Sequence, residues 1–464
     1  MTRRAVVLVD GEHYPPVIRD ALAGLLASGT QAVAAVVLGG AEKVEARGAD
    51  LGLGCPTVWA DAGDGVDVVA AAQAIRRCLE ETGAEVVVDL SDEPVLDHRR
   101  RTQLASHVLH AGVAYEGADF RFTPPPRPRV ATTPSIAVIG TGKRTGKTAV
   151  AGAVTRALAA AGRTPVVVAM GRGGPPEPVV VPAGTRLDAA ALLEVVQRGG
   201  HAASDFYEDA VTTGAATVGA RRCGGGLAGG VAHTNVVAAV EAAGRLPGDV
   251  LVLEGSGAAV PPVHADATVL VVPGDCDPEL LGGYLGPYRV LLADLVVVTM
   301  AEPPRSDPDQ VEAVLGAIRS ISRRAPLVRT VFRPVPLGPV DGARVFFATT
   351  APSAVTATLA ATLETRYGCT VVATSSRLAD RPGLRRDLEA AGAFEVLLVE
   401  LKAAAVDVAA RIADRVGARV VFCDNRPHVV GVDEDAIGEA EADAALTAAV
   451  SRVARLADER FAAR

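Results

Sequence analysis

The chain has 464 residues, of which 49% are hydrophobic and only 3% aromatic, and its formal net charge is -8. This length is too great for one ordinary core, so two or three domains are expected. The acidic balance, together with a sequence that has no long block of lysine or arginine, argues against nucleic acid as the main partner.

The first part of the chain alternates short Val-rich runs with Ala-rich stretches, a rhythm typical of parallel sheets covered by helices on both faces. The predicted elements are strands at 5–9, 31–38 and 84–90 and helices at 16–27 and 66–81. The proline-rich stretch TPPPRPR (123–129) is typical of a semi-rigid linker. We therefore predict an N-terminal α/β domain over residues 1–128.

The second part continues the same rhythm around glycine-rich segments. Its predicted elements are strands at 135–139, 164–169, 249–253, 267–272 and 295–300 and a helix at 147–160. The stretch PVPLGPVDG (334–342) predicts a second boundary. A central domain is therefore expected over residues 129–340.

The third part, residues 341–464, repeats the pattern and ends in a helix. Its predicted elements are strands at 344–348, 370–373, 394–400 and 419–422 and a tail helix at 439–464. An apolar stripe at helical spacing in the tail predicts a face docked on the domain, and it comprises Leu446, Val450, Val453 and Leu456. The expected fold class is thus multi-domain α/β with doubly wound parallel sheets.

The stretch GTGKRTGKT (140–148) follows the apolar run SIAVI and precedes a helix, which is the context of a phosphate-binding loop. We therefore expect a central P-loop NTPase domain, with Lys147 at the β- and γ-phosphates of ATP and the Thr148 hydroxyl on Mg²⁺. The expected nucleotide-binding residues are Gly140, Thr141, Gly142, Gly146, Lys147, Thr148 and Ala149. The first glycine lies one position earlier than in the common pattern.

With its shifted glycine, the loop resembles that of dethiobiotin synthetase and the cobyrinate amidation enzymes, a branch related to MinD. The lysine that directly follows the first glycine in MinD is not matched, because the corresponding place, after Thr141, holds Gly142 and the lysine falls at Lys143. This branch also has an acid and a glycine after its central strand, and DVLVLEGSGA (249–258) provides Glu254 as a Mg²⁺ ligand.

Basic residues beside glycines exceed what one ATP requires. Lys143 and Arg144 lie in the loop, Arg172 follows a strand where related ATPases place an acid, and Arg221 and Arg222 precede three glycines. Guanidinium groups bind phosphate through paired donors, so a second, highly anionic ligand is expected.

Other polar segments leave alternatives open. The run His98–Arg101 is read equally well as an anion site or as a solvated surface, and Asp10, Glu12 and His13 as a site or as a satisfied turn. The second Mg²⁺ acid is open too: Glu177 is one candidate, and the acids of SDFYEDA (204–210) either order the arginines or cap a helix.

The spacing of the cysteines and the hydropathy of the sequence indicate where in the cell the protein is expected. The six cysteines include no C-x-x-C pair, which argues against a zinc site or a redox pair and favours reduced thiols. The N-terminal stretch is too poor in apolar residues for a signal peptide, and no run of 18 uncharged apolar residues occurs. A cytoplasmic protein is expected.

Taken together, several stretches resemble the cyclic 2,3-diphosphoglycerate synthetase family. They are VDGEHYPPV, IGTGKRTGKTA, MGRGGPPEPVV, SDFYEDA, RRCGGGLAGG, EGSGAAVPPV and ELKAAAVDV, spread over almost the whole chain. The resemblance implies an ATP- and Mg²⁺-dependent ligase that closes 2,3-diphosphoglycerate into a cyclic pyrophosphate, releasing ADP and phosphate. It also implies a cytoplasmic enzyme and a homodimer.

The chemistry of that reaction suggests roles for the basic residues. Lys147, Lys143 and Arg172 are the expected catalytic residues, because they would neutralise charge on the transferring group. The expected substrate-binding residues are Arg144, Arg172, Arg221, Arg222 and Lys402, and the expected metal ligands are Thr148 and Glu254.

Two alternative functions remain open at this point. One is another ATP-dependent ligase of the dethiobiotin or cobyrinate type, whose carboxylate substrate would need fewer arginines. The other is a nucleotide switch or metallochaperone, which His- and Cys-rich tracts would favour and which this sequence does not contain.

Overall fold

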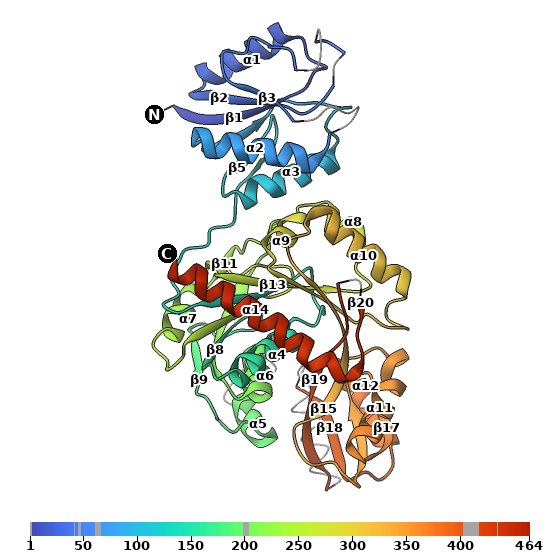
Figure 1. Cartoon of the computed structure of the whole chain (residues 1–464). Helices are drawn as coiled ribbons and strands as arrows, with labels where there is room; N and C mark the ends of the chain where they lie inside the picture. The colour runs from blue at the N-terminus through green and yellow to red at the C-terminus, as the bar shows by residue number, and fades with distance from the viewer. Residues whose placement is uncertain are drawn as a thin grey trace. The chain divides into compact units, whose positions relative to one another are not determined.

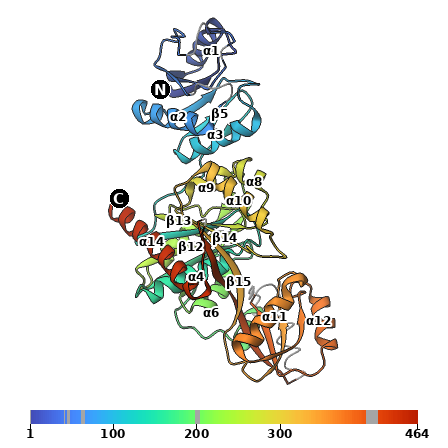
Figure 2. The same cartoon turned by 45° about the vertical axis from the view of Figure 1, so that its right-hand side comes forward.

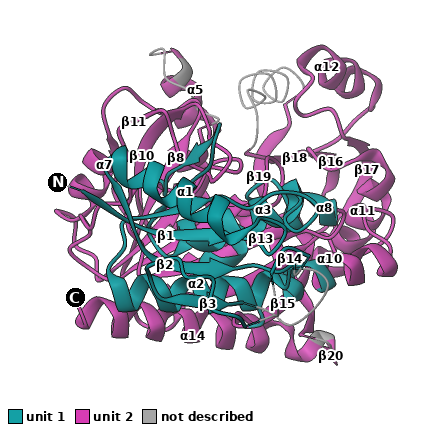
Figure 3. Cartoon of the chain, turned by 90° about the horizontal axis from the view of Figure 1, so that it is seen from above, with its two compact units in different colours: residues 1–125, 277–292, 316–323 teal, residues 126–276, 293–315, 324–464 magenta. Residues whose placement is uncertain are grey.

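The structure is a computed structural model that describes residues 2–40, 42–44, 48–60, 66–197, 204–401, 417–433 and 435–464. The chain forms two compact units (Figure 3). Unit 1 comprises Met1–Pro125, Asp277–Leu292 and Gly316–Arg323, and unit 2 comprises Pro126–Cys276, Ala293–Leu315 and Arg324–Arg464. Among the described helices, none is long and apolar enough to cross a membrane.

Unit 1 is built on a sheet with the strand order β3-β2-β1-β4-β5-β6, in which all neighbours are parallel except β5 and β6. Its elements are β1 (Arg3–Val9), α1 (Pro15–Ala27), β2 (Thr30–Val37), β3 (Thr57–Trp59), α2 (Val68–Thr82), β4 (Val86–Asp89), α3 (His98–His110), β5 (Ala114–Glu116), β6 (Arg121–Phe122), α8 (Pro278–Gly282) and α9 (Pro287–Leu292). The valine runs predicted as strands are buried, as a sheet covered on both faces requires. Asp67 caps α2 by accepting hydrogen bonds from two backbone N–H groups of its first turn.

Unit 2 contains, among its described residues, a sheet with the order β11-β10-β8-β12-β7-β13-β14-β15-β19-β18-β16-β17. The elements of its first part are β7 (Ser135–Gly140), α4 (Lys147–Ala160), β8 (Pro165–Gly171), β9 (Val179–Val181), α5 (Ala189–Gln197), α6 (Asp205–Thr213), β10 (Ala216–Cys223), β11 (His233–Thr234), α7 (Val236–Ala243), β12 (Val250–Glu254), β13 (Ala267–Pro273), β14 (Leu295–Thr299), α10 (Pro308–Ile321), which passes from unit 2 into unit 1, and β15 (Leu327–Pro336). The strands β10, β8, β12, β7, β13 and β14 are parallel, which confirms the predicted α/β class.

The same sheet continues into the C-terminal part of unit 2. The elements there are β16 (Arg344–Ala348), α11 (Ser353–Tyr367), β17 (Thr370–Ser375), α12 (Arg381–Ala390), β18 (Val396–Glu400), β19 (Arg419–Val432), β20 (Asp435–Ala436), the short 3-10 helix η1 (Glu439–Glu441) and α14 (Ala442–Ala462). Antiparallel pairing of β15 with β19 joins the two parts, and Figure 2 shows β15 leading toward α11 and α12.

The stretch 334–342, predicted as a boundary, begins inside β15 rather than in a linker. Pro334 and Pro336 lie in the strand, opposite Asn425 and Cys423 of β19. Proline is tolerated there because β15 pairs with β14 only over 327–329, so its far end has a neighbour on one side only.

The tail helix α14 packs on the phosphate-loop part of the sheet. Figure 1 shows it lying across that sheet near α4, and Val450 and Val453 belong to the core cluster that includes Ile136 of β7 and Val154 of α4. Arg460 also donates two hydrogen bonds to Asp294, at 2.7 and 2.8 Å. The apolar face of α14 therefore docks as expected, on the phosphate-loop part and also on β19, whose Val429 belongs to the same core cluster.

Candidate functional site

Four neighbouring parallel strands carry the predicted site residues to one edge of the sheet. The phosphate loop follows β7, Glu254 ends β12, Arg172 follows β8 and Arg222 lies near the end of β10. Because these strands are adjacent in the order β10-β8-β12-β7, their carboxyl ends meet at the same edge. This is where doubly wound sheets bind ligands.

The phosphate loop is shaped by glycines that leave no room for a side chain. Gly146, the N-cap of α4, has a φ of 88°, and a Cβ there would lie 2.3 Å from Cζ of Phe332. A Cβ at Gly140 would lie 2.8 Å from Oγ1 of Thr145. The Thr299 hydroxyl of β14 donates to the carbonyl of Thr145 at 2.8 Å and holds the loop in place.

Lys147 folds back over this loop, as a phosphate-binding lysine must. Its Nζ donates to the carbonyl of Gly142 at 2.7 Å and to Oγ1 of Thr145 at 3.3 Å, and its side chain is buried. Lys143 and Arg144 are exposed on the outer side of the loop, and Arg144 has a φ of 62°. The loop thus presents a concave backbone and a buried ammonium group, a typical anion-binding arrangement.

Two buried carboxyl groups lie close to Thr148, the residue after the loop lysine. Glu254 is 2% exposed and bonds to the Thr148 hydroxyl, and its carboxyl group lies within hydrogen-bond reach of Asp209 from α6, which is 1% exposed. Burial, followed by the charge of Asp205, raises the pKa of Glu254 to about 8, and burial and Glu254 raise the pKa of Asp209 well above its usual value.

The arrangement fits a divalent cation at this position. Oε2 of Glu254 and both carboxyl oxygens of Asp209 are buried without a hydrogen-bond donor. A bound cation would satisfy these oxygens and would favour the ionised carboxylates, whose pKa values burial otherwise raises. No cluster of three or more His, Cys, Asp or Glu residues suited to a metal occurs in the described parts of the chain, but Mg²⁺ usually needs only one or two carboxylates beside phosphate and water.

Two arginines converge beside the acids. A Cβ on Gly257, which has a φ of 60°, would lie 2.9 Å from Nη2 of Arg172 and 3.0 Å from Nη2 of Arg222. Burial and then the charge of Arg172 lower the pKa of Arg222, whose Nε is buried without a partner. The Nη2 group of Arg222 is held by the carbonyl of Ser256 at 2.8 Å. A pair of like charges with an unsatisfied N–H is suited to a polyanionic ligand.

Arg221 does not share this position with Arg222. Successive side chains of a strand point to opposite faces, and the Nε of Arg221 donates to the carbonyl of Pro175 at 2.8 Å. Its neighbour Asn235 accepts from the Arg221 backbone N–H at 2.7 Å. The two arginines, grouped together in sequence, therefore have different surroundings.

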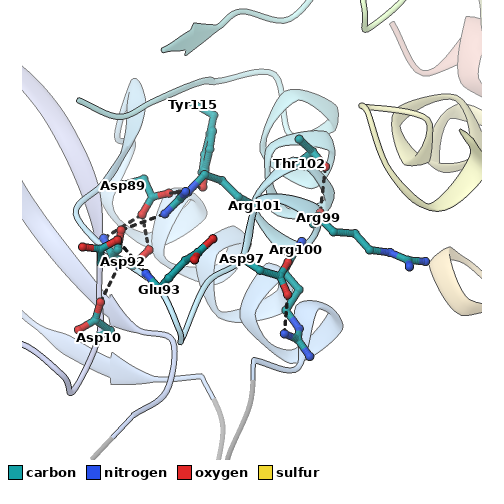
Figure 4. Close-up of polar contacts among 11 residues, drawn as sticks. Asp10, Asp89, Asp92, Glu93, Asp97, Arg99, Arg100, Arg101, Thr102 and Tyr115 are labelled. Atoms are coloured by element: carbon teal, nitrogen blue, oxygen red, sulfur yellow. Dashed lines mark hydrogen bonds and ion pairs between the residues drawn. The ribbon is translucent and has the colours of Figure 1, made fainter. Parts of the chain in front are cut away.

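The run His98–Arg101 forms the first turn of α3 in unit 1, and its arginines have carboxylate partners there. Arg100 donates to Asp97 at 2.7 Å and Arg101 to Asp89 at 2.8 Å, and Figure 4 shows these side chains turned toward one another. Arg99 donates to Glu279 at 2.8 Å. These contacts favour the structural interpretation over an anion site.

The N-terminal acid segment also forms a satisfied turn. Asp10 is fully buried and accepts from the backbone N–H groups of Glu12 and His13, from His13 Nδ1 at 2.7 Å and from the backbone of Asp92 at 2.8 Å. Asp89, on the neighbouring strand, accepts from Ser91, Arg101 and Tyr115. Both carboxyl groups organise loops at the carboxyl ends of β1 and β4.

The remaining candidates are one predicted substrate ligand and the acids considered as a second Mg²⁺ ligand. Lys402 lies outside the described residues. Glu177 is exposed, so Asp209 is the acid that lies beside Glu254. Sequence reasoning treated Asp209 only as one acid of a polar segment, although Phe206, Asp209 and Ala210 share one helical face and all three are buried. The burial of Asp209 could have been predicted, because an acid that lies within an apolar helical stripe faces the core.

Comparisons with known proteins cover nearly the whole chain. Family models match at residues 4–123, 135–331 and 336–426, and they describe the N-terminal, P-loop and C-terminal domains of cyclic 2,3-diphosphoglycerate synthetase. A cyclic 2,3-diphosphoglycerate synthetase of Rubrobacter xylanophilus is 49% identical over 433 residues, covering 93% of this chain and 95% of that protein. One of Methanothermus fervidus is 43% identical over 449 residues, covering 94% and 96%.

Among solved structures, LpxK from Aquifex aeolicus in complex with ATP aligns with 70% of this chain and 90% of its own. The sequence identity is 12% and the TM-score 0.40, a likeness too weak to support an argument.

Proposed function

Because this chain belongs to the cyclic 2,3-diphosphoglycerate synthetase family, we propose that it uses ATP to join the two phosphates of 2,3-diphosphoglycerate in an intramolecular phosphoanhydride. The products are the cyclic diphosphate, ADP and inorganic phosphate. The observation that carries this proposal is the arginine pair at Gly257, which lies at the same sheet edge as the phosphate loop. ATP alone does not require this second set of anion-binding groups.

The reaction proceeds in two balanced steps. An oxygen of one substrate phosphate attacks the γ-phosphorus of ATP, and the bond to ADP breaks. An oxygen of the other substrate phosphate then attacks the phosphorus of the activated phosphate, and the former γ-phosphate leaves as inorganic phosphate. No protein nucleophile is needed, so the side chains act by positioning and by neutralising charge.

The residues of the loop would act on the transferred phosphate. Lys147, which already points into the loop, would contact the β- and γ-phosphate oxygens once it exchanges its bond to the Gly142 carbonyl for them. Exposed Lys143 would approach the same group from outside, and Thr148 and Glu254 would hold Mg²⁺. The cation would supply positive charge that offsets the negative charge of the phosphates.

The arginines would hold the substrate. Arg172 and Arg222 would bind one substrate phosphate between them at Gly257, and Arg172 would also steady the transferring group. Arg144, exposed on the loop, would bind the other phosphate. Arg221 and Lys402 stay in the proposed substrate set, Arg221 as a support for the Pro175 segment through its bond to that carbonyl.

We further propose a cytoplasmic homodimer, as implied by the family. Sedimentation of the purified protein at several concentrations tests the assembly, and a single species with the mass of one 47.3 kDa chain would contradict it.

Phosphorus NMR of the protein incubated with Mg-ATP and 2,3-diphosphoglycerate tests the function. We expect a cyclic pyrophosphate signal that grows with ADP and inorganic phosphate in equal amounts. Lys147→Ala is expected to lower the rate roughly 10²- to 10³-fold, because a preorganised positive charge at the phosphates is lost. The matched control is Lys43→Ala in unit 1, whose ammonium group pairs with Glu42. ATP hydrolysis that does not respond to 2,3-diphosphoglycerate would overturn the proposal.

A further inference from the structure

We propose that Asp209 is a direct ligand of the divalent cation at the phosphate loop, supplying a second carboxylate beside Thr148 and Glu254. The inference deepens the proposed ATP-dependent function and rests on it. The position is not recognisable from the loop motif, because Asp209 lies on α6 and precedes Glu254 by a long stretch of chain.

The packing of α6 carries Asp209 into the site. The helix shares a small apolar core with β8, in which Phe206 and Ala210 cluster with Ala169. Phe206 also lies against Gly219 of β10, where a Cβ would lie 2.6 Å from the phenyl ring. Asp209 lies on the same face of α6 and is 1% exposed. The helix is therefore held by apolar contacts in a position that buries a carboxyl group.

A proton shared between Asp209 and Glu254 would not satisfy all of their buried carboxyl oxygens. Both oxygens of Asp209 and Oε2 of Glu254 are buried without a donor. One proton between the two groups would satisfy one oxygen–oxygen contact and still leave an Asp209 oxygen without a partner. A cation coordinated by both carboxylates, with water in its remaining positions, accounts for all three. The Thr148 hydroxyl, bonded to Glu254, places that cation beside the phosphates.

The end of β8 explains why a helix supplies this ligand. The strand is followed by Arg172, a cation, whose guanidinium group lies with that of Arg222 at Gly257. An acid at that strand end would compete for these arginines. A carboxylate supplied by α6 leaves the arginines available for an anion while completing the cation site.

Manganese binding tests the inference without turnover. Mn²⁺ is titrated into the full-length protein with saturating ADP, and free Mn²⁺ is measured by electron paramagnetic resonance. We expect Asp209→Asn to weaken Mn²⁺ binding at least tenfold, whereas Glu177→Gln, which changes an exposed acid of the same unit, changes it less than twofold. Mn²⁺ affinity of Asp209→Asn within twofold of the unmodified protein would overturn the inference.

A second variant keeps the test decisive if the amide disturbs folding. Asp209→Cys replaces a hard oxygen ligand by a soft thiolate, so a direct ligand shifts the preference from Mn²⁺ to Cd²⁺. We expect Cd²⁺ to displace bound Mn²⁺ from this variant at a concentration at least tenfold lower than from the unmodified protein. An unchanged Cd²⁺ requirement would contradict direct coordination.

The experiments distinguish a failure of the Asp209 ligand proposal from a failure of the proposed reaction. Loss of Mn²⁺ affinity in Asp209→Asn, in a protein that forms no cyclic product, would support the ligand and overturn the reaction. Formation of cyclic product by a protein whose Asp209→Asn variant binds Mn²⁺ normally would do the reverse.

Discussion

At the scale of single residues, the arginines at Gly257 distinguish substrate binding from nucleotide binding. Arg172 and Arg222 approach the same glycine, so removing either should weaken the anion that lies between them. We expect Arg172→Ala to raise the KM for 2,3-diphosphoglycerate roughly 10- to 100-fold, since a charge-assisted hydrogen bond contributes about 1.5–3 kcal/mol, while the KM for ATP stays within threefold.

Steady-state kinetics with each substrate varied in turn measures this effect. Arg186→Ala is the matched control, because the Arg186 side chain is 91% exposed and lies 3.7 Å from Asp188. An unchanged KM for the diphosphate in Arg172→Ala would remove Arg172 from the substrate site.

Gly146 tests the geometry of the loop. Alanine there would adopt an unfavourable φ of 88° and place its Cβ 2.3 Å from the Phe332 ring. We expect Gly146→Ala to weaken ADP binding at least tenfold in calorimetric titration. Adding Phe332→Ala should recover part of the affinity, because it relieves the clash and leaves only the backbone strain. Equal ADP affinity in Gly146→Ala and the unmodified protein would show that the loop tolerates this side chain.

Of the two buried acids, the sequence predicted Glu254 as a metal ligand but did not single out Asp209. Glu254 was predicted because it ends a strand and precedes a glycine, a pattern confined to neighbouring residues. Asp209 was not singled out, because its contact with Glu254 arises only from the packing of α6 on β8 and β10. A motif encodes residues close in sequence, whereas a contact between a helix and a distant strand is fixed by the tertiary fold.

At the scale of elements, periodicity predicted most strands and helices but not their partners. The buried valine runs were assigned correctly as parallel strands, and the stripe of α14 was assigned correctly as a docking face. The extension of β15 through Pro334 and Pro336 was missed, since prolines suggest a break unless the strand is known to have a neighbour on one side only.

The docking of α14 gives a stability prediction for unit 2. Val453 is 1% exposed in the core that α14 shares with β7 and α4. Val453→Ala removes two methyl groups from this core, so we expect a loss of about 2 kcal/mol in the free energy of unfolding. Urea unfolding followed by circular dichroism measures it, and Ala463→Gly just after the helix is the control. A loss below about 0.5 kcal/mol would mean that α14 is not docked in solution.

At the scale of the whole molecule, the family models and the structure divide the chain at different places. The three family models end and begin near residues 123–135 and 331–336, whereas β15 and β19 join the second and third matched stretches in one sheet. Sequence alone predicted breaks where prolines gather, because composition records chain breaks and not hydrogen bonding between distant strands. Residues 4–123 form one matched stretch and lie in unit 1, but unit 1 also contains 277–292 and 316–323, which the P-loop model matches.

The unfolding of unit 1 can be followed by tryptophan fluorescence, because Trp59 in β3 is the single tryptophan of the sequence. Burial, with His110 as the second cause, lowers the pKa of His107 in α3 to about 4 from an ordinary value of 6.5. Between these values the unfolded chain binds more protons than the folded unit, so the stability of unit 1 falls as the pH falls. The lowered pKa of Asp97 acts only below its ordinary value of 3.8, outside this window.

We therefore expect unit 1 to lose about 1–2 kcal/mol of unfolding free energy between pH 7.5 and pH 5.0, measured by urea unfolding with Trp59 fluorescence. His107→Gln should remove most of this dependence, because glutamine does not titrate. His233→Gln, which alters an exposed histidine of unit 2, should leave the Trp59 transition and its pH dependence unchanged. An equally steep loss of stability in His107→Gln would assign the acid sensitivity of unit 1 to other groups.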